Sequence, residues 1–160
     1  MLPTYLVTER GMERGFVNTI VGLSRSSTLI FVFLSGWMID KFGVKALIGW
    51  ISALAGVFTI LLGILNKQWI VPVVFLQPLI ISAFFPAALT AVADISTART
   101  QNVTISLIIP FSNFFGAGIT PVAMGFLAEQ GQFETGFIIV GALMIACLVF
   151  LNRLHVTSQA

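Results

Sequence analysis

Five long apolar segments dominate this sequence and constrain its fold more than any other feature. They cover residues 15–39, 46–65, 70–93, 103–128 and 135–154, and the connectors between them are short and polar: DKFGVK, NKQW, DISTARTQN and EQGQFE. A helix needs about 20 apolar residues to cross roughly 30 Å of hydrocarbon at about 1.5 Å per residue. Each segment therefore has the length of a transmembrane helix.

The composition favours a membrane protein and excludes a water-soluble fold. Hydrophobic residues make up 58% of the 160 residues and charged residues only 9%, whereas about a quarter of the residues of a soluble domain are charged. In hydrocarbon every backbone N–H and C=O needs an internal partner, and the sequence lacks the alternating pattern of a membrane β-barrel. We therefore predict an all-α fold, a polytopic membrane helical bundle of about five transmembrane helices, in one transmembrane domain over residues 1–160. Residues 1–8 are too few to cross a bilayer, and we interpret them as the end of a preceding helix.

Several classes of function find no support in the sequence. The eight basic residues are scattered singly and the net charge is +2, so we expect no nucleic-acid partner. The single cysteine, Cys147, cannot form an internal disulfide or a metal site by itself. The sequence contains no metal-ligand cluster, no nucleophile beside a base and no phosphate-binding loop, and MLPTYLVTERG at its start lacks the features of a signal peptide. We expect no enzyme activity, no metal and no cofactor.

Basic residues in the connectors give a small preference for one orientation, because such residues are retained on the cytoplasmic side of a membrane. With DKFGVK inside, the count is four inside and three outside: Lys41, Lys45, Arg99 and Arg153 against Arg10, Arg14 and Lys67. We expect a multi-pass integral membrane protein, located in a bacterial inner membrane or a plasma membrane.

Two glycines, an acid and two bases stand at fixed spacing around the end of the first apolar segment. Residues 36–45 read GWMIDKFGVK, and the spaced residues are Gly36, Asp40, Lys41, Gly43 and Lys45. This pattern resembles the cytoplasmic signature G-x-x-x-D-(R/K)-x-G-(R/K)-(R/K) of the major facilitator superfamily, which recurs in weaker form between that family's eighth and ninth helices. Val44 departs from the fullest version, as is typical of the second copy.

This motif has two interpretations. In the first, Gly36 allows a close helix contact, Gly43 permits a tight turn, and Asp40 caps a helix amino terminus or pairs with a base. The family pairs this acid with a neighbouring helix end, so by analogy Arg99 is the expected partner within this chain, and the contact would latch one conformer. In the second, DKFGVK is only a solvated turn between two helices.

The fourth apolar segment carries a second resemblance. It contains PFSNFFGAGITPVAMGF, which is similar to the family's eleventh helix, where a P-x-x-x-G step precedes the last outer loop. The resemblance implies that the five segments correspond to helices eight to twelve, and residues 1–8 to the end of helix seven. Glycine and proline soften a helix, which suits bending during transport, but both residues are also common in membrane helices generally. The candidates for such flexibility are Pro110, Gly116, Gly118, Pro121 and Gly125.

Arg25 is the strongest candidate for ligand recognition. It lies ten positions into the first apolar segment, close to its middle, where a charge costs at least about 2.5–3.5 kcal/mol and is expected to face a cavity. At helical spacing it shares one side with small and polar residues, the full set being Asn18, Gly22, Arg25, Leu29, Val32 and Gly36. A guanidinium grips carboxylate or phosphate groups through two parallel donors; alternatively, Arg25 pairs with an acid on a helix outside this chain. Gln77 and Asn113 are secondary candidates, either for substrate contact or for hydrogen bonds between helices.

Three functions remain open. The first is a secondary transporter of the major facilitator type, which moves a small solute, with an anion favoured, by alternating access. Its expected partners are that solute, the lipid bilayer and an amino-terminal transporter half that this chain lacks. The second is a non-transporting membrane subunit, and the third is an incomplete product without activity of its own.

Overall fold

The computed structural model describes residues 2–97 and 99–151, and its regular elements in that part are all helical. In chain order they are α1 (Leu2–Thr8), α2 (Arg14–Phe42), α3 (Val44–Ile64), α4 (Lys67–Ser82), α5 (Phe84–Ile95), α6 (Gln101–Asn113), the π-helical segment η1 (Phe114–Ile119), α7 (Thr120–Glu129) and α8 (Phe133–Leu151). The end of the fifth expected segment and Arg153 lie outside the described residues.

Within the described residues, five helices are long and apolar enough to cross a membrane, which confirms the predicted all-α bundle. Three of them are α2, α3 and α8; the other two are composite, because α4 and α5 together form Lys67–Ile95, and α6, η1 and α7 together form Gln101–Glu129. The short helix α1 precedes them, packed against α2. The observed helices extend past the predicted apolar segments by a few residues at several ends, since a helix continues into the polar interface while hydrophobicity does not.

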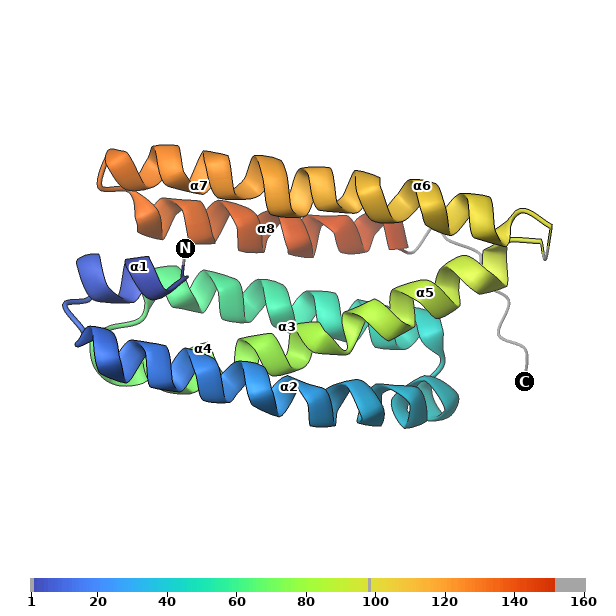
Figure 1. Ribbon diagram of the computed structural model, residues 1–160, viewed down its shortest axis with the longest axis horizontal. Helices are drawn as coiled ribbons and strands as arrows, with labels where there is room; N and C mark the ends of the chain where they lie inside the picture. Colours follow the sequence, from blue (N-terminus) through green and yellow to red (C-terminus); the bar gives the residue numbers. More distant parts are fainter. Residues whose placement is uncertain (1, 98, 152–160) are drawn as a thin grey trace.

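The helices lie side by side along one long axis (Figure 1). The most extensive contact joins α3 to α8, and α2 packs on α4. A hydrophobic core fills the end of the bundle where α1, the end of α3 and the start of α8 meet; it includes Tyr5, Leu6, Leu62, Phe133 and Phe137. A smaller core at the other end joins α3 to α4 and α5. The turns after α2 and after α5 lie at this second end, as the predicted topology requires (Figure 1).

Glycines bring α3 and α8 into close contact. A Cβ atom built on Gly56 would lie 2.9 Å from the carbonyl oxygen of Gly141, and one built on Gly63 would lie 2.7 Å from the carbonyl oxygen of Glu134. Small residues at such crossings let the backbones of membrane helices approach, which maximises van der Waals contact where lipid removes the hydrophobic driving force. Gly49, Gly56 and Gly63 recur every seven residues and therefore line the α8 side of α3.

The third membrane span is broken at Ala83. The N–H of Ala83 donates to the carbonyls of Ile80 and Ile81. The regular pattern of α-helical hydrogen bonds therefore does not continue from α4 into α5. Pro86, three residues later, has no N–H to offer the carbonyl of Ser82, and Pro78 removes a second bond within α4. The two prolines explain why the span is divided into α4 and α5.

Candidate functional site

Arg25 lies close to the middle of α2. This helix has 29 residues, so Arg25 is about 4.5 Å along the axis from its midpoint. Its side chain is exposed, and within residues 2–97 and 99–151 it makes no hydrogen bond or ion pair. An always-charged group thus lies near the middle of a membrane-length helix, with nothing in the described chain to neutralise it.

The surface of α2 divides into three faces. One face is buried against the rest of the chain and carries Val17, Val21, Ser24 and Ser35. The opposite side is apolar and exposed, and it includes Leu23, Ile30 and Phe33, of which Phe33 is 84% exposed. Since successive residues are about 100° apart, the face with Arg25 lies between these two.

The residues that share the Arg25 face of α2 by helical spacing are not buried by the rest of the described chain. The other members of this face, Asn18, Gly22, Leu29, Val32 and Gly36, are all exposed. A Cβ atom on Gly22 or Gly36 would meet nothing within 4 Å in the described chain. No described helix therefore covers this face, and the close helix contact predicted at Gly36 has no partner within the described residues.

The two secondary candidates lie in different surroundings. Gln77 is half-buried in α4, and its Nε2 donates to the Thr59 hydroxyl at 3.3 Å. That hydroxyl donates to the carbonyl of Ala55 at 2.7 Å, so the pair forms a polar contact between α3 and α4. Asn113 is exposed at the end of α6, directly before η1, and nothing in the described structure brings it to Arg25.

The motif over residues 36–45 forms the turn between α2 and α3. Gly43 adopts φ 80°, a backbone conformation that favours glycine, and it serves as both the end cap of α2 and the start cap of α3. The N–H of Gly43 donates to the carbonyl of Ile39 at 2.9 Å, and the carbonyl of Gly43 accepts from the N–H of Leu47 at 3.1 Å. The turn is thus closed by the backbone, and no side chain caps the start of α3.

Two charged residues of the motif, Asp40 and Lys41, are exposed. Lys41 lies over the Trp37 ring, with Nζ 4.7 Å from the ring centroid. Asp40 and Arg99 are exposed, and among the described residues neither makes an ion pair. The segments that carry them lie at the same end of the bundle (Figure 1), so the predicted latch is not closed in this conformer.

A charged cluster at the opposite end is one that sequence reasoning missed. Arg10 Nη2 contacts Glu134 Oε1 at 3.1 Å and donates to the Gly63 carbonyl at 2.9 Å, while its Nε donates to the Tyr5 hydroxyl at 2.8 Å. That hydroxyl donates to the Leu62 carbonyl at 2.8 Å. The positive charge of Arg10 lies at the carboxyl-terminal end of α3, where it offsets the partial negative charge of the free carbonyls. The negative charge of Glu134 lies in the first turn of α8, where it offsets the partial positive charge of the helix amino terminus. The cluster ties α1, α3 and α8 together, and we assign it to structure.

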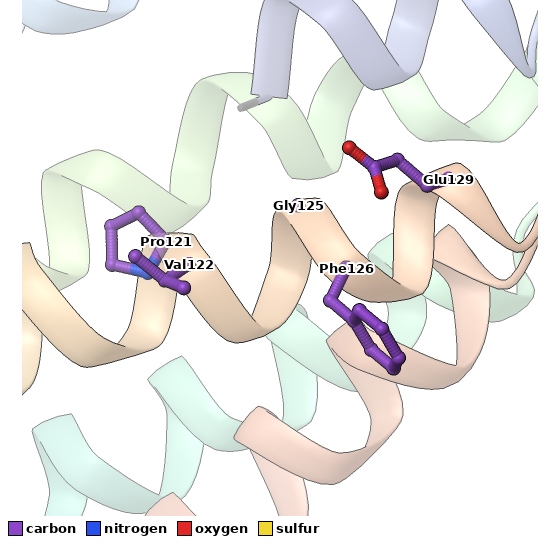
Figure 2. A pocket seen from close by; sticks show the side chains of 5 residues that line it. All are labelled: Pro121, Val122, Gly125, Phe126 and Glu129. Carbon is purple, nitrogen blue, oxygen red and sulfur yellow. The ribbon is translucent and has the colours of Figure 1, made fainter.

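The α7 part of the fourth membrane span carries an open hollow. Its lining residues all belong to α7: Pro121, Val122, Gly125, Phe126 and Glu129. Phe126 and Glu129 point away from each other (Figure 2). A hollow on one helix surface cannot enclose a ligand, and we do not treat it as a binding site.

Comparison with known proteins places the chain in one family. The model of the Major Facilitator Superfamily matches residues 1–159. No curated protein and no solved structure matches the chain. The family match extends over the five membrane-length helices and includes both the turn at residues 36–45 and the fourth span. The chain is an integral membrane protein that belongs to the major facilitator superfamily of transporters.

Proposed function

We propose that the chain forms the carboxyl-terminal half of a secondary transporter, and that Arg25 binds an anionic substrate during alternating access. The membership of the family implies a small-molecule solute. The observation that carries the finer proposal is the exposed guanidinium of Arg25 near the middle of α2, which has no hydrogen-bond or ion-pair partner among the described residues. The resemblance of residues 36–45 and 110–126 to the second-half helices supports the assignment to that half.

The free-energy cost of the Arg25 charge depends on its surroundings. Against lipid, Arg25 would cost at least about 2.5–3.5 kcal/mol. A water-filled cavity removes most of that cost, and a bound carboxylate or phosphate adds two parallel charge-assisted hydrogen bonds. The neighbouring Gly22 carries no side chain, and the space at its Cβ position is open, so it does not hinder access to the guanidinium. These features favour a cavity wall over a lipid-facing surface.

Uptake into proteoliposomes by the full gene product tests the proposal. We expect Arg25→Ala and Arg25→Lys both to lower uptake of one class of anion by at least tenfold, because lysine keeps the charge but not the paired donors. Arg14→Ala is the matched control: it removes the same side chain from the same helix at its exposed amino-terminal end, and uptake should stay near the wild-type rate.

Two other outcomes would replace the proposal. If Arg25→Lys retains full uptake while Arg25→Ala loses every solute, anionic or neutral, the arginine is a structural partner of an acid on another helix. If the wild-type protein inserts and folds but moves no solute on a broad panel, the chain belongs to a non-transporting membrane protein of this family.

We also propose that Asp40 and Arg99 pair in a second conformer and latch it. Both are exposed, and their segments share one end of the bundle (Figure 1). We expect Asp40→Arg and Arg99→Asp each to reduce the transport rate and the combination to restore most of it. Failure of the double variant to recover would remove Arg99 as the partner.

A further inference from the structure

The fourth membrane span changes its hydrogen-bond register at η1. The backbone N–H of Thr120 donates to the carbonyl of Phe115, five residues earlier. The Thr120 hydroxyl donates to the same oxygen at 2.9 Å. An α-helical bond would instead run from Thr120 to Gly116. π-Helical turns of this kind are rare and occur mostly as single turns within α-helices.

Pro121 makes the α and π registers nearly equivalent at this point. It has no N–H, so in an α register the carbonyl of Ala117 loses its donor, and in a π register the carbonyl of Gly116 does. One hydrogen bond is missing in either case. The N–H of Thr120 has an acceptor in both registers, Gly116 in one and Phe115 in the other. In the α register the proline ring also clashes with the carbonyl of Ala117, and this clash lowers the usual advantage of the α register.

Packing within the described chain does not restrain η1, whereas it does restrain α7, the helix that follows η1. A Cβ atom on Gly116 would meet nothing within 4 Å, and Phe114 and Phe115 are both exposed. In α7, by contrast, Met124 is buried, and its side chain fills the space over Gly136 of α8. One end of the span is therefore anchored to α8, and η1 is free to change register.

We propose that η1 is a register switch that rotates α6 relative to α7. Loss of the π turn shifts α6 by one residue, which is a rotation of about 100° and an axial translation of about 1.5 Å. With side chains about 5–6 Å from the helix axis, Asn113 and its neighbours in α6 then move by about 8 Å. The switch changes which face of α6 is directed toward the rest of the transporter. The span stays helical throughout. The switch concerns conformation only and stands apart from the identity of the substrate.

Pulsed electron paramagnetic resonance on the full-length protein in lipid nanodiscs tests this switch. In a Cys147→Ser background, nitroxides are attached through S106C in α6 and L143C in α8; a second pair joins V122C in α7 to L143C. Val122 and Leu143 are 74% and 61% exposed, and Ser106 is exposed as well. We expect two distances for the Ser106 pair, differing by up to about 8 Å, and one distance for the Val122 pair.

Two variants should change the relative populations of the π and α registers in opposite directions. Deletion of Ala117 removes the extra residue of the π turn, so the Ser106 pair should keep only the distance of the π register. Gly116→Ala with Gly118→Ala favours regular α-helix, and we expect the π distance to fall about fivefold or more relative to the α distance; both Cβ positions are open or in ordinary contact, so the variant should fold. A single distance in the wild-type protein, or two distances whose ratio neither variant changes, would overturn the proposal. The measurement requires no transport, so its result is independent of the role of Arg25.

Discussion

Replacing Gly141 of α8 with alanine places a methyl group where α3 leaves no room. The added Cβ would lie 2.6 Å from the Gly56 carbonyl oxygen and 2.6 Å from Cγ1 of Ile60, with the Ile60 backbone nitrogen at 2.9 Å. Two of these three atoms belong to the backbone of α3, so no side-chain rotation relieves the contact. The two helices must separate by about 0.8 Å to reach ordinary van der Waals distance.

The cost of this separation follows from two opposing terms. Overpacking of a tight contact costs about 1–3 kcal/mol, and alanine recovers about 0.5–1 kcal/mol because it restricts the unfolded chain more than glycine does. Because the contacts are with backbone atoms, the overpacking cost lies in the upper part of that range, about 2–3 kcal/mol, and we expect Gly141→Ala to destabilise the protein by about 1–2.5 kcal/mol in total. Thermal unfolding in a fixed lipid or detergent, followed by tryptophan fluorescence, measures the effect as a lowered midpoint.

Gly22→Ala is the matched control for this experiment. Gly22 is also inside a long membrane helix, but a Cβ there meets nothing within 4 Å, so its midpoint should stay the same or rise. If Gly141→Ala and Gly22→Ala have the same midpoint, the close contact between α3 and α8 does not hold the bundle together, and the packing argument is wrong.

Two further predictions concern the ends of the bundle. Arg10→Ala should lower the stability by about 1.5–3 kcal/mol, because the arginine is 13% exposed and its loss removes charge-assisted hydrogen bonds. Glu134→Gln should cost less than about 1 kcal/mol, since that carboxylate is 53% exposed and screened by water; equal effects in thermal unfolding would contradict this assignment. Gly43→Ala should cost about 1–2 kcal/mol because φ is 80° there, whereas Gly36→Ala, with open space around the Cβ, should be neutral; the same unfolding assay decides between them.

The five spans were predictable from sequence because hydrophobic length alone specifies a membrane helix. The turn at Gly43 followed from the spacing of the motif, and the positive φ found there matches the predicted tight turn. The resemblance of residues 36–45 to a family signature led to the same family that the match over residues 1–159 identifies.

The internal details of the spans were less predictable. The break in the third span was not predicted from the sequence. Pro78 and Pro86 each remove a backbone hydrogen bond there, but the position of the break at Ala83 depends on which carbonyls find other donors. Gly49, Gly56 and Gly63 recur every seven residues, a pattern that indicates a contact face without naming the partner helix. That α8 is the partner emerges only from the tertiary structure.

The charged residues show where sequence reasoning reaches its limit. Arg10 was expected only to contribute to the charge outside the membrane, yet it forms the bridge to Glu134, a residue 124 positions away. No local pattern encodes such a pair. The depth of Arg25 in its helix predicts polar surroundings, because a charge in the middle of a membrane helix is costly against lipid; the cavity that this prediction requires stays a prediction.

Thiol accessibility tests most directly whether the Arg25 face lines a water-filled cavity. In a Cys147→Ser background, R25C and F33C place a cysteine on the Arg25 face and on the exposed apolar face of the same helix. The account predicts that a charged, membrane-impermeant thiol reagent labels R25C rapidly and leaves F33C unlabelled in the intact bilayer. Labelling of F33C alone, or of neither position in protein that is folded and inserted, would contradict a cavity at Arg25.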